Sequence, residues 1–393
     1  MIIKSVNAKA ILDSRKDKTI EVTINTNAGK FKSSSPSGKS VGKHEGKAYK
    51  KSLELDITTL KKFSDYFSEE KIENFNDLRR IEDILDRHVG ANSITALEFC
   101  VLKALAKEQK KEIWELVNPK HDFFAKIKKP KFPRLVGNCV GGGKHSQTKD
   151  KKPDFQEFLL IPKTKTIKEA FELNKEIQKK IGTILEEKDP NFKNKKNDEN
   201  AWITSLNEKE ILDILKNQKV EIGFDIAASS FYKRKKYHYE NPLLTRTSEE
   251  QLGYIRNMIK NYKILYIEDG FNEEDFERFS ELLKKTKDCL IVGDDLTVTN
   301  SKRLEKAIKM KSINAIIVKP NQCGSLLEVE KVCELAKKNN IKIIFSHRSG
   351  ETNENILADL AFGFQADFLK CGISGYGREE KIKRLIEIEN NFK

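Results

Sequence analysis

The feature that most constrains this chain is the regular alternation of short apolar runs with amphipathic stretches after residue 128. Short apolar runs are typical of buried strands, and the amphipathic stretches between them have the spacing of helices. Strands that alternate with helices through short loops are expected to be parallel. A repeat of about 25 residues over a length of about 250 favours a (β/α)8-type barrel.

An open, doubly wound sheet is the other architecture that such an alternation allows. That sheet would require a glycine-rich phosphate-binding turn after its first strand. The glycine cluster of this chain, Gly141–Gly143, lacks the spacing of such a turn. The pattern therefore predicts an α/β protein with a barrel.

The residues before 128 have a different organisation. Alternating, β-branched segments at 2–12, 19–26 and 29–35 predict strands, and the segments 47–63, 76–89 and 93–109 have helical periodicity. The last helix is expected to begin at Ser93, whose hydroxyl suits an N-cap. Two prolines in a basic run near residue 128 indicate a boundary. We expect an α+β N-terminal capping domain over 1–127 and a barrel domain over 128–393.

Composition narrows the class of protein. No apolar run approaches the roughly 18 residues that a membrane span requires, and no signal peptide is visible at the N-terminus. The six cysteines are far apart and show no zinc-binding spacing, which is typical of reduced thiols. We therefore expect a cytoplasmic protein without a membrane partner.

The net charge of +14 raises the question of nucleic-acid binding. The lysines are interleaved with acids along the whole chain, as on solvated helix faces. The densest basic run, Lys233–Lys236, lies among tyrosines and could contact phosphates. We do not expect a nucleic-acid site, but a basic RNA- or anion-binding protein on the same scaffold stays an alternative.

Polar residues end the apolar runs in a regular order along the chain. The first three runs end in carboxylates, namely Asp225, then Glu268 with Asp269, then Asp294 with Asp295. The next run ends in Lys319, the one after it in His347, Arg348 and Ser349, and the last in Lys370. In a parallel barrel the carboxyl ends of all strands open on one face. These side chains are therefore expected to share a cavity.

The three acidic strand ends, at Asp225, Glu268 and Asp294, predict an oxygen-rich site that suits Mg²⁺ better than zinc. Lys319 follows four apolar residues, so its amine should lie beside the metal. Burial and a nearby dication would lower its pKa toward that of a usable base. The guanidinium of Arg348 and the hydroxyl of Ser349 suit a phosphate or a carboxylate.

Several longer motifs resemble the enolase family over nearly the whole chain, from about residue 8 to 389. The motifs are ILDSR at 11–15, SGKSVGKHE at 37–45, QEF at 156–158, DIAASSFY at 225–232, IED at 267–269, GDDLTVTN at 293–300, KPNQ with GS at 319–325, and SHRSGET at 346–352. The KPNQ form and the C-terminal sequence look more like archaeal enolases than others.

The resemblance implies an Mg²⁺-dependent phosphopyruvate hydratase that converts 2-phosphoglycerate into phosphoenolpyruvate and water. Lys319 would remove the C2 proton, and Glu199, supported by Glu157, would protonate the leaving hydroxyl. The first Mg²⁺ would be held by Asp225, Glu268 and Asp294, and a second by Ser40 together with the substrate. The remaining substrate-binding residues would be His145, Gln156, His347, Arg348, Ser349 and Lys370. The resemblance also implies a dimer or a higher homo-oligomer.

Some positions depart from the family's pattern. Glu199 lies in Asn197–Ala201, where enolases have G-D-E-G-G, and the loss of glycines restricts left-handed backbone conformations. Gly141 stands where the family has asparagine, and Lys16–Lys18 stand where it has G-N-P. A diverged enolase with an altered substrate or weak turnover is therefore a second alternative.

Overall fold

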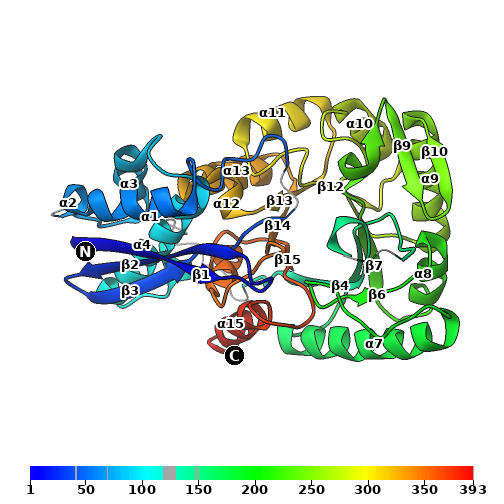
Figure 1. Ribbon diagram of the computed structural model, residues 1–393, viewed down its shortest axis with the longest axis horizontal. Coiled ribbons are helices and arrows are strands. Elements are labelled where there is room, and N and C mark those ends of the chain that lie inside the picture. The colour runs from blue at the N-terminus through cyan, green and yellow to red at the C-terminus, as the bar shows by residue number, and fades with distance from the viewer. Residues whose placement is uncertain (40–41, 69, 118–129, 147, 149, 393) are drawn as a thin grey trace.

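The computed structural model describes residues 1–39, 42–68, 70–117, 130–146, 148 and 150–392. Figure 1 shows two parts, a small N-terminal sheet with its helices in blue and cyan, and a larger barrel from green to red. The expected domain boundary between residues 127 and 128 lies outside the described residues.

The N-terminal part is an antiparallel sheet covered by helices. Its strands, in the order β1-β2-β3, are β1 (Ile3–Leu12), β2 (Lys18–Thr26) and β3 (Gly29–Ser34). Its helices are α1 (Leu53–Lys62), α2 (Ser64–Phe67), α3 (Leu78–Leu85), α4 (Ala91–Gln109) and α5 (Ile113–Leu116), with a 3₁₀ turn η1 (Phe75–Asp77). The inward positions of β2, Ile20, Val22 and Ile24, are fully buried, as the period of two predicts.

The expected start of the third helix was two residues too late. Helix α4 begins at Ala91 with Gly90 as its N-cap. Ser93 lies inside the first turn, where its hydroxyl donates to the buried carboxylate of Asp56 at 2.7 Å. The same carboxylate accepts from the Gly90 N–H at 2.7 Å, so a side chain distant in sequence replaces the expected cap.

The barrel is a closed sheet, which confirms the predicted α/β barrel behind a smaller α+β domain. Its strands are β4 (Arg134–Gly141), β5 (Glu157–Ile161), β7 (Glu221–Asp225), β11 (Tyr266–Glu268), β12 (Leu290–Gly293), β13 (Ala315–Val318), β14 (Lys342–Ser346) and β15 (Phe368–Lys370). They pair in the order β4-β5-β7-β11-β12-β13-β14-β15, and β15 pairs back to β4. A short strand, β6 (Trp202–Ile203), adds to β4 outside the ring.

One strand differs from the expectation of an all-parallel barrel. Strand β5 is antiparallel to both of its neighbours, β4 and β7. The segment between β4 and β5 contains only a 3₁₀ turn, η2 (Gly143–His145), among its described residues, and a parallel return would need a full crossover. As a result Glu157, at the start of β5, pairs with Asp225, at the end of β7.

Helices surround the barrel strands (Figure 1). They are α7 (Ile167–Lys188), α8 (Glu208–Leu215), α9 (Ser248–Tyr262), α10 (Phe276–Lys285), α11 (Ser301–Met310), α12 (Pro320–Cys323), α13 (Leu326–Lys338), α14 (Ile356–Gly363) and α15 (Glu379–Asn390). Among the described residues, none of the helices has the length and apolar character needed to cross a membrane.

The basic run at 233–236 lies in a small antiparallel sheet on the barrel. This sheet contains β8 (Tyr232–Lys233), β9 (Lys236–Glu240) and β10 (Leu243–Arg246), after a 3₁₀ turn η3 (Ala228–Phe231). The lysines point to solvent, whereas Tyr237 and Tyr239 are buried in the core. The aromatic rings of these two residues are therefore not available to stack on bases, and such stacking is one of the two contributions to single-strand binding.

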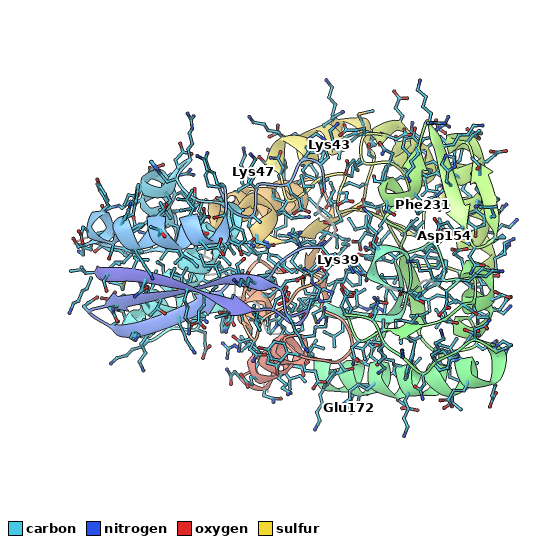
Figure 2. The ribbon with its side chains drawn as sticks, viewed as in Figure 1. Lys39, Lys43, Lys47, Asp154, Glu172 and Phe231 are labelled. Atoms are coloured by element: carbon cyan, nitrogen blue, oxygen red, sulfur yellow. The ribbon has the colours of Figure 1, made fainter. Side chains whose placement is uncertain are left out.

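Two acids, the buried Glu208 and the half-buried Asp154, support the loop that leads into β5. The Glu208 carboxylate, at the start of α8, accepts from the backbone N–H of Asp154 at 2.7 Å, and Asp154 (labelled in Figure 2) in turn accepts from the N–H groups of Glu240 and Asn241. Burial, and next the charge of Asp154, raise the pKa of Glu208 to about 7. The folded protein therefore binds this proton more tightly than the unfolded chain does.

The Glu208→Gln variant is expected to gain stability relative to the wild type as the pH rises. A raised folded-state pKa gives stability that is complete below the unfolded value near 4.5 and is lost as the pH rises through about 7. Thermal unfolding should therefore differ little at pH 4.5, and the variant should unfold roughly 2–4 °C higher at pH 8. Glu172→Gln, at an exposed site on α7 (Figure 2), is the control. A gain that is equal at both pH values would contradict the role of Glu208.

Candidate active site

A cavity opens at the carboxyl ends of the barrel strands, and most of the expected site residues line it. These are His145, Gln156, Glu157, Glu199, Asp225, Asp294, Lys319, His347, Arg348, Ser349 and Lys370. Glu268 is fully buried beside them and contacts Lys370. Ser40 lies outside the described residues.

Lys370 joins three carboxylates from neighbouring strands. Its ammonium donates to Asp225 at 3.0 Å and to Glu268 at 2.8 Å, and it lies 3.3 Å from Glu157. Burial by itself lowers the pKa of Lys370, but the surrounding carboxylates, Asp225 first, raise it well above its usual value. Lys370 is therefore a permanent cation at the base of the cavity.

Lys319 forms the second cationic centre. It follows β13, and its ammonium donates to the Asp294 carboxylate at the end of β12. The other Asp294 oxygen accepts from Gln322 at 2.9 Å. Burial is the largest single influence on the pKa of Lys319 and lowers it, but the charges of Asp294 and then Glu268 raise it, and the net shift for the side chains alone is upward. The lowering expected beside a dication stays a prediction.

The carboxylates in this cavity outnumber its cations, and their pKa values reflect the crowding. Burial, followed by the charge of Asp225, raises the pKa of Glu268 well above its usual value. Burial and the charge of Asp294 raise the pKa of Asp295 to about 8. One Glu268 oxygen and the Gln156 side-chain oxygen are buried without a hydrogen-bond partner among the described residues. Such groups are costly unless a cation or a donor reaches them.

A second group of titratable side chains surrounds Glu199. His145 Nδ1 lies 3.4 Å from an oxygen of Glu157 and 3.4 Å from an oxygen of Glu199, and Asn138 donates to the other Glu199 oxygen at 3.0 Å. Burial alone lowers the pKa of His145, but Glu199 and then Glu157 raise it to about 10. Burial raises the pKa of Glu157, as does the charge of Glu199. The group can therefore hold and move a proton.

The N-terminal domain completes the cationic side of the site. Arg15 donates to the Ser349 hydroxyl at 3.0 Å, and Arg348 donates to Glu45 at 2.9 Å. Lys39, labelled in Figure 2 where the N-terminal domain meets the barrel, donates its backbone N–H to Ser349 at 2.9 Å. Its ammonium lies 3.8 Å from Asp198. Both domains thus contribute a cationic side chain, Arg15 from one and Arg348 from the other, to the surroundings of Ser349.

Two family models match the chain, one for each part of the structure. The model described as "Enolase, N-terminal domain" matches residues 3–117, and the one described as "Enolase, C-terminal TIM barrel domain" matches residues 130–393. The chain belongs to the enolase family.

Curated enolases of archaea are similar to this chain over nearly its full length. The enolase of Methanosphaera stadtmanae is 35% identical, with 100% of this chain and 97% of the relative covered. That of Pyrobaculum aerophilum is 34% identical, covering 94% and 90%, and that of Archaeoglobus fulgidus is 33% identical, covering 99% and 97%. The resemblance found in the sequence motifs is thus confirmed.

Two strand-end acids that the sequence places beside this enolase site, but to which the resemblance gives no role, also belong to it. Asp269 and Asp295 line the cavity, and ligand atoms of Asp269, Asp294 and Asp295 lie within 4.8 Å of one another. Asp269 accepts from the N–H groups of Asp294 and Asp295 at 3.1 and 2.7 Å, so it fixes the backbone that presents Asp294. Their place in the cavity agrees with their position at the ends of the apolar runs, whereas the hydrogen bonds of Asp269 join two strands and have no local sequence pattern.

Proposed function

We propose that this chain is a working phosphopyruvate hydratase that interconverts 2-phosphoglycerate and phosphoenolpyruvate plus water at the cavity described above. The family assignment supports the reaction. The observation that carries the assignment of roles is that Lys319, Glu199 and the strand-end acids line one cavity. We infer that the two domains divide between residues 127 and 128, as the sequence indicates.

The residues at the strand ends fit a divalent ion of the magnesium type. They offer carboxylate and amide oxygens, the ligands that Mg²⁺ prefers. Within the part of the chain that the structure describes, no cation or donor reaches one oxygen of Glu268 or the side-chain oxygen of Gln156. Asp225, Glu268 and Asp294 would hold the first ion, and Ser40 with the substrate would complete a second site. When bound, such ions supply Lewis-acid stabilisation to the substrate carboxylate, which gains a second charge when the C2 proton leaves.

Lys319 would act as the base that takes the C2 proton. The main cause that raises its pKa is the carboxylate of Asp294. When that carboxylate also binds a dication, its charge raises the pKa of Lys319 less, and burial then lowers the pKa toward a value that suits a base. The ammonium of Lys370, which stays charged, would bind the substrate carboxylate.

Glu199 would deliver a proton to the C3 hydroxyl so that it leaves as water. Its contact with His145, which also reaches Glu157, provides a route by which a proton can move between these groups. His347 lies 3.9 Å from the same Glu199 oxygen. Arg348, Ser349, His145 and Gln156 would surround the substrate and hold its anionic groups.

The basic-surface alternative gains no support from the structure. Of the three tyrosines beside the basic run, Tyr237 and Tyr239 are buried and Tyr232 is half-buried. A cytoplasmic location and a dimer or higher homo-oligomer follow from the family resemblance, and sedimentation of the purified protein tests the second of these.

Formation of phosphoenolpyruvate from 2-phosphoglycerate, followed by ultraviolet absorbance, tests the proposed function. We expect steady turnover with Mg²⁺, its loss when a chelator removes the ion, and its return when Mg²⁺ is added in excess. Glu199→Gln should lower kcat by about 10²- to 10⁴-fold, because it removes the proposed acid. A wild-type protein that folds and binds Mg²⁺ but forms no phosphoenolpyruvate would instead support a diverged enolase.

A further inference from the structure

The turn that carries Glu199 is stabilised by a side chain of the same turn. The side-chain oxygen of Asn197 accepts from the backbone N–H of Glu199 at 3.0 Å and from that of Ala201 at 3.0 Å. Because two donors point at this atom, it must be the oxygen of the amide and not the nitrogen. The backbone N–H of Asn197 also donates to the Ala201 carbonyl at 2.9 Å, which closes the turn.

The chain therefore compensates for the missing glycines of this turn. Asn200 adopts the left-handed conformation, with φ at +62°, which asparagine tolerates better than most residues. Its side chain donates to Ser374 at 2.5 Å, and its carbonyl accepts from Gln178 at 3.0 Å. The turn is thus attached to the barrel through both the side chain and the carbonyl of Asn200, the residue that follows Glu199.

Gly141, the last residue of β4, leaves the space that the Asn197 side chain fills. A Cβ atom at position 141 would overlap the amide nitrogen of Asn197 and lie 3.1 Å from its Cγ. That amide nitrogen is buried and has no hydrogen-bond partner among the described residues, so it is held there by packing. Any larger residue at 141 would push Asn197 off the turn.

We propose that Asn197 is a positioning residue for Glu199 and that Gly141 is its obligatory partner, so that the two positions act as one unit. The proposal rests on the proposed function, in which Glu199 is the acid. It also explains two departures from the family pattern together, since asparagine is absent from 141 and present at 197. When a side chain at one of these two positions fills the space, no room is left for a side chain at the other position.

Four variants test the pair: Asn197→Gly, Gly141→Ala, the double variant and Glu199→Gln. Each of the first two is expected to lower kcat by roughly 10- to 100-fold, because the acid is misplaced, and to change KM by less than about threefold. The kcat of the double variant should be within about threefold of that of Asn197→Gly, because the methyl group added at position 141 no longer meets a side chain at position 197. If the two substitutions acted independently, their reductions in kcat would multiply in the double variant, and that result would contradict the proposed pairing of Asn197 with Gly141.

The readouts separate this proposal from the function on which it rests. Exchange of the C2 proton with solvent should persist in all four variants, because Glu199 acts after that step, whereas a general loss of folding would remove it. Asn194→Gly, the same substitution at an exposed position of the same segment, is the control and should leave kcat unchanged. If Glu199→Gln loses activity but Asn197→Gly does not, the positioning role is wrong. If Glu199→Gln retains full activity, the assigned acid is wrong.

Discussion

Replacing Lys319 by alanine is expected to lower kcat about 10³- to 10⁴-fold, the upper part of the range for a lost general base, while KM for 2-phosphoglycerate changes only a few fold. The variant removes the group that takes the C2 proton. The cationic groups that hold the substrate, Lys370 and Arg348, stay in the cavity. Initial rates of phosphoenolpyruvate formation at saturating Mg²⁺ measure the effect.

A folding measurement and a control variant are needed to show that the loss of activity comes from loss of the base. Lys319 is ion-paired with Asp294, so its loss leaves a buried carboxylate that lacks a partner, and thermal unfolding must show that the variant is folded. Lys309→Ala, at an exposed position in the last turn of α11, is the matched control and should have wild-type activity. A folded Lys319→Ala protein with a kcat near that of the wild type would contradict the proposed base.

Replacing Asp294 by asparagine is expected to affect both the metal and the base. The variant preserves the shape of the side chain, but it removes the charge that contacts Lys319 and that would contact Mg²⁺. We expect the affinity for Mg²⁺ to fall by about 100-fold or more. Mutation of residues that only support a metal ligand lowers metal affinity about 10- to 100-fold, and loss of a ligand itself should have at least that effect. Activity at ordinary Mg²⁺ concentration should fall by about 10³-fold, equivalent to several kcal/mol of charge stabilisation.

Calorimetric titration with Mg²⁺ measures the first effect, and activity against Mg²⁺ concentration measures the second. Asp288→Asn is the control, because this exposed residue lies just before β12, at the end away from Asp294. Part of the lost activity should return at high Mg²⁺ if weak binding is the cause. An Asp294→Asn protein that binds Mg²⁺ as tightly as the wild type would exclude Asp294 as a ligand.

Much of the barrel was predictable because strand and helix periodicity is local. Each apolar run ended in a polar residue, and parallel strands bring such ends together, so the cavity around Asp225, Asp294 and Lys319 followed from the sequence. The reversed direction of β5 did not, because its cause is the connection to β4 and not the strand itself. The apolar run in β5 predicts a strand, but it does not indicate whether that strand is parallel or antiparallel to its neighbours.

Contacts between distant segments were beyond the sequence. Arg15 meets Ser349 and Glu45 meets Arg348 across more than 300 residues, and no local pattern encodes such pairs. The ion pair of Lys319 with Asp294, which raises the pKa of the lysine in the side chains alone, was not predicted because the sequence indicated Asp294 only as a metal ligand. The pairing of Gly141 with Asn197 is another case, since each looked like an isolated departure.

Incubation of 2-phosphoglycerate in heavy water, with nuclear magnetic resonance to follow loss of the C2 proton, tests most directly that Lys319 starts the reaction. Glu199→Gln should still exchange this proton while it forms little phosphoenolpyruvate, whereas Lys319→Ala should do neither. Exchange by a folded, Mg²⁺-loaded Lys319→Ala protein at the wild-type rate would show that another group takes the proton.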